Sequence, residues 1–258
     1  MINAAHDIGP ILADICEEAG RLILPLWKSE LTVHTKSDES PVTEADRRGE
    51  ALILERLAAK FPGMHVVSEE DASEFGTPEA VGRQFFLVDP VDGTKAFVRG
   101  DPNFTVNIAL IEDGQPVAGA VTAPATGETW FTQDGQAMKR VEGGATRPIR
   151  ARDWPKGQAV ALVSHTMKPE TIASLAEKYG FDEPQPMDSS IKFCRIAEGA
   201  ADLYPRHGPT MEWDIAAGHA VLAAAGGSVR SEDGSTFVYG KADKGFRNGW
   251  FVARGAAD

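Results

Sequence analysis

Acidic residues lie where two predicted strands end and where one predicted helix begins. Glu69 and Glu70 follow the strand "HVVS", Asp89 and Asp92 follow "FFLV", and Asp214 opens the helix in "EWDIAAG". The end of a strand holds the residues after it in fixed positions, so we expect these carboxylates to converge on one point. The chemistry open to such a group is cation binding.

A cluster of carboxylates is unstable without a positive charge. Several acids at one point repel each other and raise each other's pKa. A hard divalent cation removes that conflict, and ligation by oxygen alone favours Mg²⁺, Mn²⁺ or Ca²⁺ over zinc. No His or Cys belongs to the group. The sequence therefore predicts a site for a hard divalent metal.

Each acid also has a structural interpretation when it is taken alone. Asp214 has the position of a helix N-cap, and Asp46 has that of the acidic partner of Thr43 in a capping box. The acids at 69–71 could form a solvated strand end, and 89–93, "DPVDG", suits a type I turn. Only their joint occurrence favours a metal site.

Two helices and two strands are expected to position these acids. Apolar residues recur at intervals of three and four over 8–26, which predicts an amphipathic helix that frays at Pro25. A second helix is predicted over 43–61, where Pro62-Gly63 stops it. "MHVVSEED" is predicted as a short strand and "QFFLVDP" as a strand buried on both faces.

Turn residues divide the rest of the chain. Asp-Gly pairs at 113–114 and 134–135 predict antiparallel hairpins. After residue 150 the pattern becomes strand and helix in alternation, with helices predicted in "KPETIASLAEKYG", "SIKFCRIAEGA" and "WDIAAGHAVLAAAGG". We therefore expect an N-terminal α+β lobe over 1–150 that carries most metal ligands. A C-terminal α/β lobe over 151–258 should carry Asp214 and the residues that select the substrate.

Composition limits the classes of function. The chain has 258 residues, a formal net charge of −12 and a pI of about 5.0, which argues against a nucleic-acid partner. Its two cysteines, Cys16 and Cys194, lie far apart, so a reduced cytoplasm is expected. No apolar run is long enough for an integral membrane segment. Loose contact with the inner face of the membrane and the oligomeric state stay open.

Three motifs together resemble a known superfamily. "SEED", "DPVDGT" and Trp213-Asp214, followed after eleven residues by Gly226-Gly227, are similar to motifs of the lithium-sensitive, magnesium-dependent phosphatases that include inositol monophosphatase and fructose 1,6-bisphosphatase. Within it the chain most resembles bacterial 3'(2'),5'-bisphosphate nucleotidases of the CysQ type. The segments that carry this likeness are "KSDESPVTEAD", "FTVNIALI" and "SSIKFCRIAEGAADLYPRHGPTMEWDIAAGHAV", and Ala96 departs from the Glu that is common there.

The resemblance implies a fold and a set of metal ligands. It implies an α/β (α+β) fold with layers in the order α-β-α-β-α. Glu69, Asp89 and the Val91 carbonyl would hold one Mg²⁺, while Asp89, Asp92 and Asp214 would hold a second. Glu70 would lie near the water of a third, weaker ion, so two or three ions are expected.

The resemblance also implies catalytic and substrate residues. Asp46 and Thr94 would orient the attacking water, with Glu70 as a further catalytic acid, and the amides of Gly93 and Thr94 would cradle phosphate oxygens. Glu69, Val91, Asp92 and Asp214 would also meet the substrate through the metals. Its second phosphate, ribose and base would be met by Ser164, His165, Ser189, Lys192 and Arg206.

The implied substrate is adenosine 3',5'-bisphosphate, together with the related 3'-phosphoadenylyl sulfate of sulfur metabolism. The implied reaction is removal of the 3'-phosphate by metal-activated water. Two alternatives stay open: an inositol monophosphatase or other sugar phosphatase of the same superfamily, and a binding module that holds metal without catalysis. Lys192 could also be a surface charge on a helix, and His165 a satisfied polar residue at a strand end.

Overall fold

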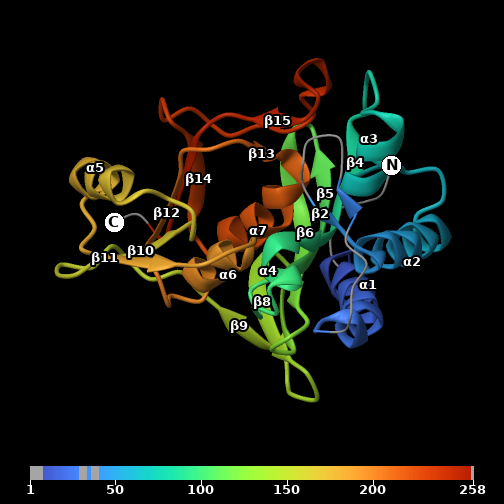
Figure 1. Cartoon of the computed structure of the whole chain (residues 1–258), viewed down its shortest axis with the longest axis horizontal. Coiled ribbons are helices and arrows are strands. Elements are labelled where there is room, and N and C mark those ends of the chain that lie inside the picture. The colour runs from blue at the N-terminus through green and yellow to red at the C-terminus, as the bar shows by residue number, and fades with distance from the viewer. Residues whose placement is uncertain (1–7, 29–33, 36–40, 257–258) are drawn as a thin grey trace.

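Helices and sheets alternate in layers through the molecule (Figure 1). The computed structural model describes residues 8–28, 34–35 and 41–256. On one side of the larger sheet lie α1 (Ile8–Ile23) and α2 (Glu44–Lys60). Between the two sheets lie α6 (Ile191–Ala197) and α7 (Glu212–Ala224), and α5 (Pro169–Tyr179) covers the smaller sheet. The expected α-β-α-β-α layering is confirmed.

The larger sheet has seven strands in the order β3-β4-β5-β6-β7-β8-β9. Their bounds are β3 (His65–Ser68), β4 (Gln84–Asp92), β5 (Thr105–Glu112), β6 (Gln115–Ala123), β7 (Glu128–Gln133), β8 (Gln136–Val141) and β9 (Arg147–Ile149). Only β3 and β4 pair in parallel. Both predicted hairpins are confirmed, and Asp113 and Gly114 have φ of 49° and 75°, the left-handed backbone that a tight hairpin turn needs.

The smaller sheet has five strands in the order β11-β10-β12-β16-β14. They are β10 (Val160–Val163), β11 (Glu183–Pro186), β12 (Leu203–Arg206), β14 (Ser228–Ser231) and β16 (Phe251–Arg254). Two short pairs complete the strands: β1 (His34–Thr35) with β2 (Pro41–Val42), and β13 (Thr210–Met211) with β15 (Arg247–Asn248). The remaining elements are η1 (Leu24–Leu26), α3 (Glu69–Phe75), α4 (Thr94–Val98) and η2 (Ala242–Lys244).

Strand β4 shows why the layers form. Its residues Phe86 and Val88 belong to the apolar cluster under α1 and α2, while Phe85 and Leu87 belong to the cluster that includes residues of α6 and α7. Successive side chains of a strand point to opposite faces, so an apolar run must be covered on both sides. This confirms the predicted burial of the strand on both faces.

Helix α7 approaches the larger sheet closely. A Cβ at Gly119 of β6 would lie 2.8 Å from both the Ala217 carbonyl oxygen and the Ala220 Cβ, so glycine is required at this contact. Because α7 comes from the C-terminal part of the chain, it carries Asp214 across to the N-terminal sheet. The two sheets divide between β9 and β10, and the separation into lobes 1–150 and 151–258 stays a prediction.

Some element ends differ from the expected ones. The predicted strand "MHVVSEED" stops at Ser68, and its acids open α3 instead. Asp89 and Asp92 do not lie on a turn, because β4 continues through both, with a shift in its pairing to β5 between them. The "KSDES" part of the motif at 36–46 lies outside the described residues. No helix in the described ranges is long and apolar enough to cross a membrane.

Candidate active site

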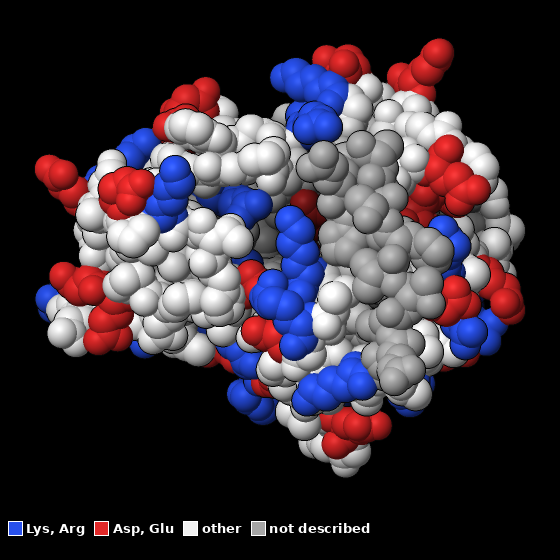
Figure 2. Space-filling model, in the orientation of Figure 1, with Lys and Arg blue, Asp and Glu red and all other residues white. Residues whose placement is uncertain are grey.

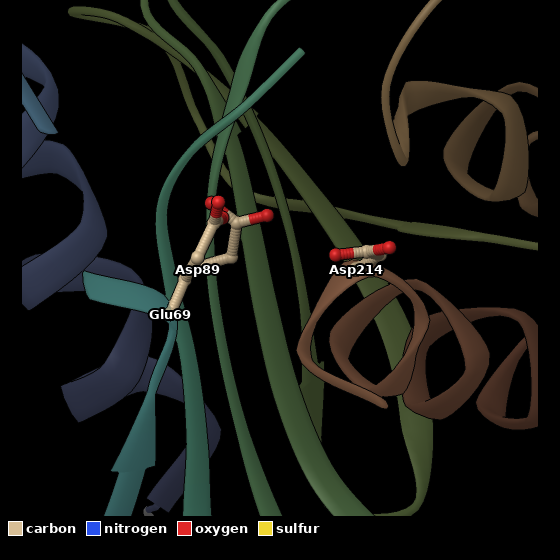
Figure 3. A group of neighbouring side chains, drawn as sticks. All are labelled: Glu69, Asp89 and Asp214. Carbon is tan, nitrogen blue, oxygen red and sulfur yellow. The ribbon is translucent and has the colours of Figure 1, made fainter. Parts of the chain in front are cut away.

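Three acids from separate elements meet at one point. Glu69, Asp89 and Asp214 each offer a carboxylate oxygen, and these oxygens lie within 4.8 Å of one another. Figure 3 shows Glu69 beside Asp89, with Asp214 facing them from the start of α7. The predicted convergence of these three residues is therefore present in the fold.

The pairing of β3 with β4 places the first two acids. The strands are parallel, with Ser68 opposite Val88, so Glu69, the first residue of α3, lies next to Asp89, which is still within β4. Parallel strands end at the same edge of a sheet, which brings both carboxylates together. Asp214 lies in the first turn of α7, where its Oδ2 accepts the Met211 N–H at 2.7 Å. Its helix-capping role and its place in the cluster are thus compatible.

The site's electrostatics fit a bound cation. The pKa of Asp214 is well above its usual value, first because of burial and then because of the negative charges of Asp92 and Glu69. Burial likewise raises the pKa of Asp92 to about 6, although Lys192 and the Ser190 N–H oppose that shift. Carboxylates that resist ionisation together accept a hard divalent cation, because its charge removes the repulsion. The donor atoms are all oxygens, the ligands that a hard cation such as Mg²⁺ prefers.

Asp92 lies beside this group and is held from the C-terminal part of the chain. Its Oδ2 accepts the backbone N–H of Ser190 at 2.5 Å, and Asp92 lines the same pocket as the three acids. Its role as a metal ligand stays a prediction, as does that of the Val91 carbonyl. Ser190 was not predicted, although it lies within the motif "SSIKFC". Its hydroxyl donates to Asn107 Oδ1 at 2.7 Å, which connects that motif to "FTVNIALI".

Asp46 and Thr94 come together as predicted. The Asp46 Oδ2 atom accepts the N–H and the hydroxyl of Thr43 at 2.7 and 2.6 Å, which completes the capping box of α2. Its other oxygen, Oδ1, lies 3.4 Å from Thr94 Oγ1, which is also 3.1 Å from the Val91 carbonyl oxygen. The cap therefore fixes Asp46 so that one oxygen faces Thr94.

Glu70 is buried, and the residue that holds its backbone was missed by the sequence reasoning. Glu50 of α2 is 5% exposed, and its Oε1 accepts the N–H groups of Glu70 and Asp71 at 3.1 and 3.3 Å. Ser68, the N-cap residue of α3, makes no capping bond with its side chain. Glu50 thus caps the helix whose first residue is Glu69. The only sequence signal was an acid four positions after Asp46, on the same face of α2.

A pocket of about 650 Å³ contains the acids and extends to a basic wall. Its volume suits a small phosphorylated ligand. Figure 2 shows basic side chains around a hollow near the middle of one face, with an acidic side chain recessed in it. The basic residues that line the pocket are Lys95, Arg99, His165, Lys192 and Arg206.

The predicted substrate residues all line this pocket, but they differ in burial and in hydrogen bonding. Lys192 is not a surface charge: it is 4% exposed, its Nζ donates to the carbonyls of Met187 and Ser189, and burial lowers its pKa to about 8. Arg206 donates to the Pro209 carbonyl oxygen at 3.1 Å. Ser189 has a φ of 56° and its Cβ lies 3.2 Å from where a Cβ at Gly93 would be. Only glycine therefore fits at 93, which has a φ of 89°.

His165 and Ser164 follow β10 at the rim. His165 Nδ1 lies 3.3 Å from Asp188 Oδ2, and the Ser164 hydroxyl lies 3.1 Å from that of Thr166. Asp188 and Arg99 were not predicted as site residues, although both line the pocket. The substrate roles of the predicted residues stay predictions.

Comparisons with known proteins agree on the family. The inositol monophosphatase family matches residues 7–253. A "3'(2'),5'-bisphosphate nucleotidase CysQ" of Salmonella typhimurium is 39% identical over 89% of this chain and 94% of its own length. A "Histidinol-phosphatase" of Mycobacterium tuberculosis is 33% identical over 89% of this chain and 88% of its own. The crystal structure of CysQ from Bacteroides thetaiotaomicron has a TM-score of 0.77 at 32% identity, covering 96% of this chain and 97% of that one.

Proposed function

This chain belongs to the inositol monophosphatase family, and we propose that it is a Mg²⁺-dependent phosphatase that removes the 3'-phosphate of adenosine 3',5'-bisphosphate. The observation that carries the proposal is the acid cluster of Glu69, Asp89 and Asp214 at one end of a pocket whose other wall is basic. The relatives named as bisphosphate nucleotidases span almost the whole chain, which supports this choice of substrate. The related 3'-phosphoadenylyl sulfate is proposed as a second substrate.

Glu69, Asp89, Asp92 and Asp214 would hold the metal ions, with the Val91 carbonyl. Bound divalent cations would supply a lowered pKa for water and positive charge for the phosphate and the leaving oxygen. No covalent nucleophile is then required of the protein. We also propose a cytoplasmic location.

The chain's own residues supply orientation. Asp46 is fixed by Thr43 with its Oδ1 3.4 Å from the Thr94 hydroxyl, and it would accept a hydrogen bond from that hydroxyl or from a water beside it. Thr94 stands at the start of α4, where backbone N–H groups would meet the substrate phosphate. Together these groups would hold an attacking water and the phosphate in line, which is most of what catalysis of phosphoryl transfer requires.

A substrate panel tests the proposed function. Phosphate release should be measured in Mg²⁺ with adenosine 3',5'-bisphosphate, inositol 1-phosphate, fructose 1,6-bisphosphate and histidinol phosphate. We expect the bisphosphate nucleotide to have the highest kcat/KM. A higher value for one of the others would replace the proposed substrate while keeping the family chemistry, and no turnover of any ester would favour the non-catalytic binding module.

A substitution beside the acid cluster tests the proposed metal site. Asp92→Asn should lower turnover by orders of magnitude while the melting temperature stays close to that of the wild type. Asp113→Asn is the matched control, because Asp113 lies in an exposed hairpin turn and pairs with Arg83. Full metal-dependent activity of the Asp92→Asn enzyme would contradict the assignment.

A further inference from the structure

Arg99 connects the acid-bearing part of the chain with the basic wall of the pocket. It follows α4, the short helix that starts at Thr94, so it lies five residues from the proposed phosphate cradle. Its Nη2 donates to Asp188 Oδ2 at 2.7 Å, across 89 positions of sequence. Both residues line the pocket that contains the acid cluster. None of the sequence motifs pointed to either residue.

The helix sets the distance between the two ends of the pocket. An α-helix rises 1.5 Å per residue, so Arg99 lies roughly 7 to 8 Å along the axis from Thr94. The long arginine side chain adds further reach. A ligand with one phosphate at Thr94 could therefore place a second phosphate, a few atoms away, within the reach of the guanidinium, because both residues line the same pocket.

The Asp188 contact leaves the guanidinium able to bind an anion. A guanidinium carries five N–H donors in a planar fork, and the bond to Asp188 uses Nη2. Asp188 Oδ2 is also 3.3 Å from His165 Nδ1, so the single carboxylate lies between two nitrogen groups of the pocket rim. Asp188 is 19% exposed and Arg99 is 51% exposed, which leaves the arginine facing solvent in the pocket.

Lys192, which was predicted to meet the second phosphate, is less free to do this. The Lys192 ammonium group donates to two backbone carbonyls and is buried. An exposed ion pair such as Arg99–Asp188 adds little to stability, so its position at the pocket rim calls for another explanation. Arginine suits phosphate recognition because its fork matches two phosphate oxygens.

We propose that Arg99 is a specificity residue that binds the second phosphate of the substrate, the one that is not hydrolysed. This inference rests on the proposed function and extends it to a residue outside the predicted set. In it, Arg99 keeps its contact with Asp188 through one nitrogen and donates to phosphate oxygens through the others. Substrates that lack the second phosphate gain nothing from Arg99.

The test compares two substrates that differ only in that phosphate. Values of kcat and KM are measured for adenosine 3',5'-bisphosphate and adenosine 3'-monophosphate with the wild type, Arg99→Ala and Arg99→Lys. Arg83→Ala is the control, because Arg83 is also an exposed arginine in an ion pair but does not line the pocket. The product adenosine 5'-monophosphate is tested as an inhibitor of each enzyme.

We expect Arg99→Ala to lower kcat/KM for the bisphosphate about tenfold or more, mainly through KM, since a hydrogen bond to a charged group has that weight. The kcat/KM for adenosine 3'-monophosphate should change less than about twofold in Arg99→Ala. For the bisphosphate, the kcat/KM of Arg99→Lys should lie between those of the wild type and Arg99→Ala, and inhibition by adenosine 5'-monophosphate should weaken in the same order. Equal losses on both substrates, or no loss on either, would overturn the inference. A wild type that does not hydrolyse the bisphosphate would instead overturn the proposed function, and the inference with it.

Discussion

Glu50 gives a quantitative test of how the acid cluster is held. Replacing it by Ala removes the acceptor of two N–H groups in the first turn of α3, at 3.1 and 3.3 Å. Loss of a helix cap costs about 1 kcal/mol, and a buried N–H without a partner costs about 1 to 3 kcal/mol. Because one of the two donors is at a less buried residue, we expect Glu50→Ala to destabilise the fold by about 2 kcal/mol. For a chain of this size that is a loss of roughly 4 to 8 °C in melting temperature.

Glu50→Gln separates the acceptor from the charge. Burial raises the pKa of Glu50, so the folded protein binds this proton more tightly than the unfolded chain does. The buried charge therefore lowers stability above the folded pKa, and that cost fades as the pH falls through the folded pKa and is absent below the unfolded value. Gln keeps an oxygen acceptor without the charge. We expect this variant to be at least as stable as the wild type at pH 7.

The same pair of variants reports on the metal site. Because Glu50 caps the helix that starts at Glu69, Glu50→Ala should raise the Mg²⁺ concentration needed for half-maximal activity, and Glu50→Gln should leave it close to the wild-type value. Melting curves and Mg²⁺ titrations of phosphate release measure the two effects. Glu55→Ala, at an exposed position of α2, is the control. Identical behaviour of the Ala and Gln variants in both assays would refute the capping role.

Three further outcomes are expected. Although burial alone would raise it, hydrogen bonds from Arg195 and Lys139 lower the pKa of Glu128 to about 2 from 4.5. Glu128→Gln should therefore lower the free energy of unfolding by about 3 kcal/mol at pH 7. The difference from the wild type should fade as the pH falls from the unfolded pKa of this carboxyl towards 2. Urea denaturation at several pH values in that range measures it. Thr94→Val should lower kcat by about a hundredfold or more with a smaller change in KM, because it removes the hydroxyl next to Asp46; unchanged kcat would argue against its role. Lithium at millimolar concentration should inhibit, because a small monovalent ion can occupy the proposed magnesium site at Asp92 and Asp214. Unchanged activity in its presence would count against the nucleotidase subfamily but not against the proposed metal ligands.

Local patterns explain why much of the fold was predictable. The stripe of α1, the capping box at Thr43, the Asp-Gly turns and the left-handed Gly180 after α5 are all short-range signals. They state which backbone conformation each segment prefers, whatever the rest of the chain does. The start of α3 was harder, because its cap comes from Glu50 of another helix rather than from Ser68 next to it.

The candidate site was predictable only in part, for a related reason. Glu69 and Asp89 could be expected together because both lie near the same end of two predicted strands, although β4 continues through Asp89. The contacts of Arg99 with Asp188 and of Asp92 with Ser190 join residues 89 and 98 positions apart. No periodicity or spacing encodes which side chains meet across two layers, so these partners required the folded structure.

The most direct test of the account is phosphate release from adenosine 3',5'-bisphosphate as a function of Mg²⁺ concentration, with the product identified by phosphorus NMR. We predict no release in a chelator, recovery when excess Mg²⁺ is added, and adenosine 5'-monophosphate as the product. Release that is unaffected by the chelator, or a product that keeps its 3'-phosphate, would contradict the proposal that Glu69, Asp89 and Asp214 hold metal for this reaction.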